Sequence, residues 1–152
     1  MSKVDIIHKL GDPDLKMNQF KLWIHGRQFP ELDDFWDGNW LNVSAYCNES
    51  GASVYTNGTI VHLSEIEKWL NLCQDMNQKL SGVAELKFLE PNLAFQIKLK
   101  KGSGTLEICI TPDHMNQDHK FTFDIDQSYL SSIILDCKEI LKEYPIKNKE
   151  NV

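Results

Sequence analysis

The sequence predicts an α+β fold, in which an antiparallel meander sheet of six or seven strands packs on one face against two amphipathic helices. Three observations support this prediction. Seven short segments alternate apolar and polar residues with the period of two that marks a strand with one buried face. Two longer segments repeat apolar residues at helical spacing, and turn signals separate most neighbouring strands by only a few residues. A layer of strands and a layer of helices can then bury each other's apolar faces.

The first half of the chain contains three of the predicted strands. Residues 20–25 and 41–47 each alternate apolar and polar side chains. Residues 52–62 have the composition of a third strand, but Asn57-Gly58 interrupts them. This dipeptide favours either a two-residue hairpin turn or a bulge, and the sequence leaves both alternatives open.

The first helix is predicted to start near Ser64, because Ser64 and Glu67 have the spacing of a capping box. Its apolar stripe consists of Ile66, Trp69, Leu70, Cys73 and Met76. Ser81-Gly82 is expected to end this helix. The chain then returns to alternating patterns, which predict strands at 83–89, 93–100, 105–111 and 121–125.

The second helix is predicted to follow Asp126 or Ser128, either of which can cap it, and to end at Pro145. Its stripe comprises Leu130, Ile133, Ile134, Cys137, Ile140, Leu141 and Tyr144. Asp124 and Asp126 also form a D-x-D pattern, which holds a metal in some transferases. The strong helical pattern that follows favours the capping role for Asp126.

These elements predict a single α+β domain over residues 19–146. Residues 1–18 lack a sustained period and include the turn signal Gly11-Asp12-Pro13-Asp14, so we expect them to form an N-terminal extension. Residues 147–152 are polar, and we expect a disordered tail.

Composition restricts the partners. The net charge of −6 and the single arginine, Arg27, argue against nucleic acid and favour a basic protein partner. No apolar run reaches the ~18 residues of a membrane helix. Charges at Lys3, Asp5 and Lys9 interrupt any secretory signal. We therefore expect a cytoplasmic protein with no membrane contact, either a monomer or a weak dimer.

The sequence predicts no catalytic residue, no cofactor and no metal site. The loop before the last strand offers four possible metal ligands, Asp113, His114, Asp118 and His119, but such residues are also common turn formers on irregular backbone. No nucleophile elbow or phosphate-binding glycine loop is present. Four widely spaced cysteines fall within strand or helix patterns and are expected to be small buried hydrophobes: Cys47, Cys73, Cys109 and Cys137.

The loop between the first two strands is the most unusual segment. Carboxylates and aromatic rings alternate there without a lysine or arginine, at Phe29, Glu31, Asp33, Asp34, Phe35, Trp36, Asp37 and Trp40. One interpretation is structural, with aromatic rings plugging the end of the sheet and Asp37-Gly38-Asn39 forming a turn. The other is an acidic surface that binds a basic protein. The candidate partner-binding residues are Glu31, Asp33, Asp34, Trp36 and Asp37.

Four motifs in order carry a resemblance to a known family. They are Q-F-P at 28–30, D-D-F-W-D-G-N-W-L at 33–41, E-L-K-F-L-E-P at 85–91 and D-Q-S-Y-L at 126–130. Together they resemble the WapI family of small bacterial immunity proteins, and the likeness runs from about Phe20 to Tyr144. The segment W-D-G-N-W-L is its most specific part.

The resemblance implies an immunity protein, not an enzyme, that binds and neutralises the C-terminal toxic domain of a WapA-like polymorphic toxin, typically a nuclease. An acidic inhibitor suits a basic nuclease cleft. Two alternatives stay open. One is a small enzyme with a carboxylate and histidine site assembled from loops, for instance from Asp34, Asp37, His62 and His119. The other is an interaction adaptor that uses an exposed sheet face or an unpaired edge strand.

Overall fold

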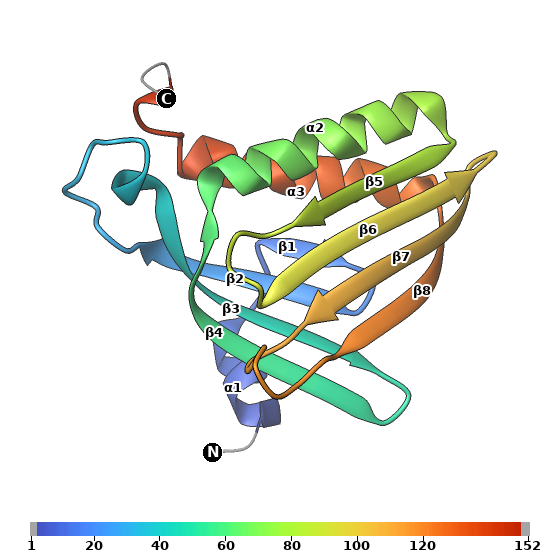
Figure 1. The fold of residues 1–152 in the computed structure, drawn as a ribbon, viewed down its shortest axis with the longest axis horizontal. Coiled ribbons are helices and arrows are strands. Elements are labelled where there is room, and N and C mark those ends of the chain that lie inside the picture. The colour runs from blue at the N-terminus through green and yellow to red at the C-terminus, as the bar shows by residue number, and fades with distance from the viewer. Residues whose placement is uncertain (1–2, 150–152) are drawn as a thin grey trace.

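The computed structural model describes residues 3–149, which form two antiparallel four-stranded sheets and three α-helices (Figure 1). The first sheet contains β1 (Leu15–Met17), β2 (Phe20–Arg27), β3 (Trp40–Glu49) and β4 (Ala52–His62). The second contains β5 (Gly82–Lys87), β6 (Leu93–Lys100), β7 (Ser103–Ile110) and β8 (Lys120–Asp126). The helices are α1 (Lys3–Leu10), α2 (Leu63–Lys79) and α3 (Ser128–Glu143), and a short 3₁₀ turn, η1 (Asp37–Asn39), precedes β3.

The α+β class and the antiparallel pairing are confirmed, but the prediction of one sheet of six or seven strands is wrong. Each sheet is a simple meander, with orders β1-β2-β3-β4 and β5-β6-β7-β8. Their apolar faces pack on each other, and the ring of Phe20 in β2 lies 5.1 Å from that of Phe95 in β6. Alternation reveals that a strand has one buried face without revealing what covers it. Here α2 lies between the two meanders in the sequence, so they form separate sheets, and the second sheet covers the apolar face of the first.

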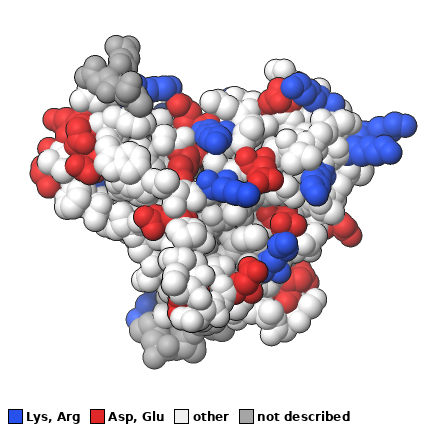
Figure 2. All heavy atoms as spheres, viewed as in Figure 1, with Lys and Arg blue, Asp and Glu red and all other residues white. Residues whose placement is uncertain are grey.

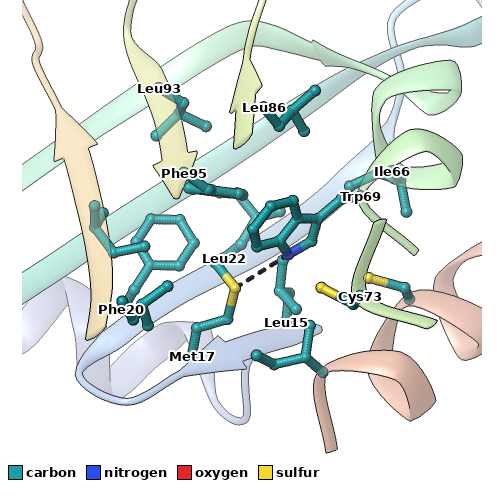
Figure 3. Packing of buried hydrophobic residues seen from close by; sticks show 14 of the residues in the cluster. Leu15, Met17, Phe20, Leu22, Ile66, Trp69, Cys73, Leu86, Leu93 and Phe95 are labelled. Carbon is teal, nitrogen blue, oxygen red and sulfur yellow. Dashed lines mark hydrogen bonds between the residues drawn. The ribbon is translucent and has the colours of Figure 1, made fainter. Parts of the chain in front are cut away.

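The helices occupy a different place from the one predicted. They pack on each other and beside strands at the sheet edges, α2 against β5 and α3 against β1 (Figure 1). Trp69 of α2 contacts both sheets, because its ring lies 5.3 Å from Phe95 and its Nε1 donates to the Met17 sulfur at 3.3 Å (Figure 3). The two helices therefore close the opening between the sheets instead of covering one face.

The segment expected to be an N-terminal extension contains α1 and β1. Strand β1 pairs with β2, and its Leu15 and Met17 side chains are almost fully buried. At the other end, Lys147 and Lys149 of the expected tail hydrogen-bond to the body of the protein. Residues 150–152 of that tail lie outside the described part of the chain.

The structure excludes one of the two alternatives for Asn57-Gly58 and corrects the predicted start of α2. Asn57 and Gly58 pair with β3 inside an unbroken β4, so a hairpin turn is excluded, and the register shift falls at Ile60. The capping box is formed by His62 and Glu65, not by Ser64 and Glu67, and α2 begins at Leu63.

At the start of α3, neither Asp126 nor Ser128 occupies the predicted N-cap position, although Asp126 does bind the first helical residue. Its Oδ1 accepts hydrogen bonds from the backbone nitrogen and the hydroxyl of Ser128, at 2.8 and 2.5 Å. The residue at the N-cap position itself is Gln127, whose side chain makes no capping hydrogen bond. Asp126, the residue before the N-cap, therefore satisfies one free N–H group of the first helical turn.

Cys47, Cys73 and Cys137 are buried as the sequence predicts, whereas Cys109 is only half-buried. Burial raises the pKa of Cys47 and of Cys137 to about 12, so both thiols stay protonated at neutral pH. Within residues 3–149, no helix combines the length and apolar character that crossing a membrane requires.

Candidate functional site

The loop between β2 and β3, residues 28–39, is held in place by hydrogen bonds to its backbone and to the side chain of Asn39. Buried Asn39 is the central anchor. Its Nδ2 donates to the carbonyls of Phe35 and Lys147 at 2.7 and 2.9 Å. Its Oδ1 accepts from Arg27 Nη1 at 3.0 Å and from the Lys147 backbone nitrogen at 2.9 Å. This one amide joins the loop, the end of β2 and the C-terminal segment.

The two cations beside the loop bind carbonyl oxygens rather than neutralising its acids. The acceptors are the carbonyls of Gly38 and Pro145 for Arg27, at 2.8 and 2.5 Å, and of Pro30 and Leu32 for Lys147, both at 2.7 Å. Among the acids of the 28–39 loop, Asp33 alone has a carboxylate within ion-pair distance of one of them, 3.6 Å from Lys147 Nζ. Arg27 and Lys147 therefore fix the shape of the loop and leave most of its negative charge in place.

Asp34 and Gly38 form the turn inside the loop. Asp34 Oδ2 accepts from the Asp37 nitrogen at 2.8 Å, and its carbonyl accepts from the Gly38 nitrogen at 3.0 Å. A Cβ on Gly38 would lie 2.6 Å from the carbonyl oxygen of Leu32, so no larger residue fits without movement. These contacts support the structural interpretation of this part of the loop.

His62, the N-cap of α2, binds the backbone of the loop. Its Nε2 lies 3.1 Å from the carbonyl oxygens of both Phe35 and Trp36. Its Nδ1 accepts from the Ser64 nitrogen at 3.2 Å, so the proton of the neutral ring resides on Nε2. The side chain is 2 % exposed, and burial lowers the pKa of His62.

Glu65 connects the same corner to the turn between β5 and β6. Its Oε1 accepts from the His62 nitrogen and its Oε2 from the Leu89 nitrogen, both at 2.8 Å. Burial raises the pKa of Glu65. The capping box of α2 thus fixes two separate segments at once, and it places Trp36 beside Leu89.

Together these segments form an exposed surface. Trp36 is 51 % exposed and Leu89 is 61 % exposed. Both line a hollow of about 350 Å³, whose other walls are Gln28, Asp37, Trp40, Thr59 and Glu90. Both also line a second hollow, of about 250 Å³, together with His62, Ser64, Glu65, Lys68, Leu86 and Lys87. We call the whole area the Trp36 surface, defined by Glu31, Asp33, Asp34, Trp36, Asp37, Leu89 and Glu90.

Negative charge gathers on the loop. Carboxylate side chains cluster at the left of Figure 2, over the loop that lies at the left of Figure 1. Within residues 3–149, the carboxylates of Glu31 and Asp37 accept no hydrogen bond and form no ion pair. They are therefore free to meet a partner.

All five predicted partner-binding residues lie exposed on this one loop. Their roles differ, because Asp34 supports the turn, whereas Glu31, Trp36 and Asp37 face solvent. Sequence reasoning missed Leu89 and Glu90, which the β5–β6 turn brings to the same surface. One local signal was present, since Phe88-Leu89 places two apolar residues side by side where a strand with one buried face would alternate.

The catalytic alternative gains no support from the geometry. Within residues 3–149, no three metal-binding side chains come together, and Asp113 instead accepts from Met115 and Asn116 in its own loop. The suggested set of Asp34, Asp37, His62 and His119 does not assemble either. The ring of His62 binds the Phe35 and Trp36 carbonyls and Ser64, whereas His119 bonds Gln117 at 3.3 Å.

One serine and histidine pair does form across the first sheet. His25 Nε2 lies 2.7 Å from Ser44 Oγ, which lies 3.0 Å from the hydroxyl of Tyr55. No pattern in the sequence predicts this pair, because β2, β3 and β4 each contribute one residue. Ser44 is only 2 % exposed, so a substrate carbonyl cannot reach its hydroxyl. We interpret the group as a cross-strand hydrogen-bond network.

A larger hollow, of about 750 Å³, lies between residues 11–21 and α3. Its walls carry charges of both signs, from Asp12, Lys16, Lys21 and Asp136. The Asp136 carboxylate already accepts from the Lys16 nitrogen at 3.0 Å. We place the candidate site at the Trp36 surface, because the charged residues that define it are all acidic and adjoin the exposed side chains of Trp36 and Leu89.

Comparison with known proteins agrees with the motifs in the sequence. The model of the immunity protein WapI-like family matches residues 12–145. That range includes β1, the 28–39 loop and the β5–β6 turn. Searches of curated proteins and of solved structures found no match. Because the family model covers most of the chain, the protein belongs to the WapI-like family of immunity proteins.

Proposed function

We propose that this protein binds the C-terminal toxic domain of a cognate WapA-like toxin, a nuclease, and neutralises it through the Trp36 surface. One observation carries the choice of surface: a half-exposed tryptophan stands among unpaired carboxylates on a loop whose backbone is already fixed. Tryptophan is enriched among the residues that dominate binding energy at protein interfaces. A loop held in shape before binding loses little conformational entropy in the complex.

The charge supports the same partner. A nuclease must attract polyanionic nucleic acid, so its cleft is basic. The acids of the 28–39 loop complement such a cleft and accelerate association by electrostatic steering. Inhibition then requires only that the bound protein occupies the path of the nucleic acid. No catalytic group is needed for this role.

The direct test is association with the toxin domain encoded just upstream. We expect a stable complex, loss of nuclease activity in it, and an association rate that falls as salt increases. The Glu31→Gln/Asp33→Asn variant should associate about tenfold more slowly. Asp124→Asn/Glu139→Gln, which removes equal charge from β8 and α3, is the matched control. Absence of a complex with the wild-type chain would overturn the proposal.

A second candidate, an adaptor that adds a partner strand to a sheet edge, is favoured by one feature of β4. This outer strand carries no Asp, Glu, Lys or Arg between Ala52 and Val61, whereas charged residues normally protect such edges. The edge strand β8 has three charges, and the other two edges lie beside helices. An Asn57→Lys variant tests this mode. Toxin binding that is lost in Asn57→Lys but retained in Trp36→Ala would favour the adaptor.

A further inference from the structure

We infer that the 350 Å³ hollow beside Trp36 receives the guanidinium group of one arginine from the toxin domain, an inference that rests on the proposed function. The hollow combines aromatic and acidic walls. Trp36 and Trp40 meet edge to face, with ring centroids 5.5 Å apart at 88°. Asp37 and Glu90 supply two carboxylates, and the residues that line the hollow include no lysine or arginine.

This combination suits arginine better than lysine. A guanidinium is planar, so it can stack on an indole face while its N–H groups donate to a carboxylate. An ammonium is a compact, strongly hydrated charge that cannot match both geometries together. The Gln28 amide oxygen and the Thr59 hydroxyl add acceptors, although the hydroxyl already donates to Asn42 at 2.6 Å.

The neighbouring 250 Å³ hollow is unsuitable for an arginine side chain. Lys68 and Lys87 line it and would repel a cation. Its one acid, Glu65, already accepts two backbone N–H groups. The ring of His62 also stacks on Trp36 there, with centroids 5.3 Å apart at 27°. His62 lines the 250 Å³ hollow but not the 350 Å³ hollow, so its ring does not take up space there.

The walls of the hollow are in position before a ligand arrives. His62 holds the Trp36 carbonyl, and Glu65 holds the Leu89 nitrogen, so the two sides are tied to the same turn of α2. A ring that is already oriented binds a cation without an ordering cost. Arginine recognition is thus built into the fold of the free protein.

The hollow can be tested on the free full-length chain with N-acetyl-L-arginine methylamide as the probe. We expect a saturable shift of the Trp36 and Trp40 indole N–H signals in NMR. The lysine analogue should bind at least about threefold more weakly. The Asp37→Asn/Glu90→Gln variant, which preserves side-chain shape, should abolish the shift, whereas Glu85→Gln on β5 should not. Equal shifts from both probes, or shifts that persist in the double variant, would overturn the inference.

Affinity measurements with the toxin domain distinguish a failure of this inference from a failure of the proposed function. The Asp37→Asn/Glu90→Gln variant should raise Kd about tenfold or more, as for loss of a buried charge pair. An unchanged Kd would overturn arginine recognition and leave the proposed function intact. Failure of the wild-type chain to form a complex would overturn the proposed function, and the probe titration would still decide the chemistry of the hollow.

Discussion

The 28–39 loop and the 111–119 loop are both connections between strands that carry carboxylates, but their structures differ. The first has four acidic and three aromatic residues among twelve, and the second has two acidic residues and two histidines among nine. The first is held from outside, by Arg27, His62 and Lys147, whose side chains meet its backbone carbonyls. The second is held at its start by the Asn92 amide, which donates to the carbonyls of Thr111 and Pro112. Beyond that point it closes on itself, because Asp113 accepts from the Met115 nitrogen and the Asn116 amide at 3.1 and 2.9 Å.

The difference shows which acids remain available for binding. A loop that is held by other parts of the protein keeps its own carboxylates free and its backbone in place. A loop that uses its carboxylates for its own turns has fewer to offer. Residues that appear equally functional in a sequence can therefore differ in what they are able to bind.

The largest expected effect is the loss of Asn39, the loop residue that links the 28–39 loop to Arg27 and Lys147. Asn39→Ala removes four hydrogen bonds of a buried amide and leaves half-buried partners unsatisfied, so we expect the free energy of unfolding to fall by about 3 kcal/mol. Urea denaturation measures this change. Asn116→Ala in the other loop removes one exposed bond and should cost under about 0.5 kcal/mol. Similar losses in both variants would contradict the contrast between the loops.

An exposed apolar side chain in each loop provides the next comparison. Trp36→Ala should weaken toxin binding by about 2 kcal/mol, roughly 30-fold, because it removes the aromatic centre of the surface. Met115→Ala removes a side chain that is 79 % exposed and should leave Kd unchanged. Calorimetric titration gives both values. Equal affinity of the two variants would place the interface elsewhere.

The smallest effect concerns pH. Burial lowers the pKa of His62 below its ordinary 6.5, so the unfolded chain takes up the proton first as the pH falls. Stability from the neutral ring is therefore complete above pH 6.5 and decreases below it. The raised pKa of Glu65 acts oppositely, since its contribution is lost as the pH rises above its ordinary 4.5. The free energy of unfolding, measured by urea denaturation at several pH values from 5 to 7.5, should change less with pH in His62→Asn than in the wild type. An identical pH dependence in the two proteins would refute this role of His62.

Much of the fold was predictable, because alternation and helical spacing are local properties. The strands and the two long helices appear where the patterns place them. Strand β1 has three residues, too few for a periodic signal, and it forms only because β2 pairs with it. The start of α2 was misplaced by the spacing of Ser64 and Glu67, since the actual cap is a histidine, which is uncommon at that position.

The sequence predicted the chemical character of the candidate site but not the contacts that hold it in place. The composition of the 28–39 loop indicated an acidic, aromatic surface, and the five candidate residues are exposed there. Its anchors could not be found, because Lys147 reaches Pro30 and Leu32 from the far end of the chain. Glu90 and Leu89 join the surface through tertiary structure. No local pattern encodes such distant contacts.

Hydroxyl-radical footprinting of the complex with the toxin domain tests the central claim most directly, because both loops carry an exposed, readily oxidised side chain. Trp36 and Met115 serve as the two reporters in one experiment. We predict that the toxin domain protects Trp36 from oxidation and leaves Met115 as reactive as in the free protein. Oxidation of Trp36 at an unchanged rate in a saturated complex would contradict binding through the Trp36 surface.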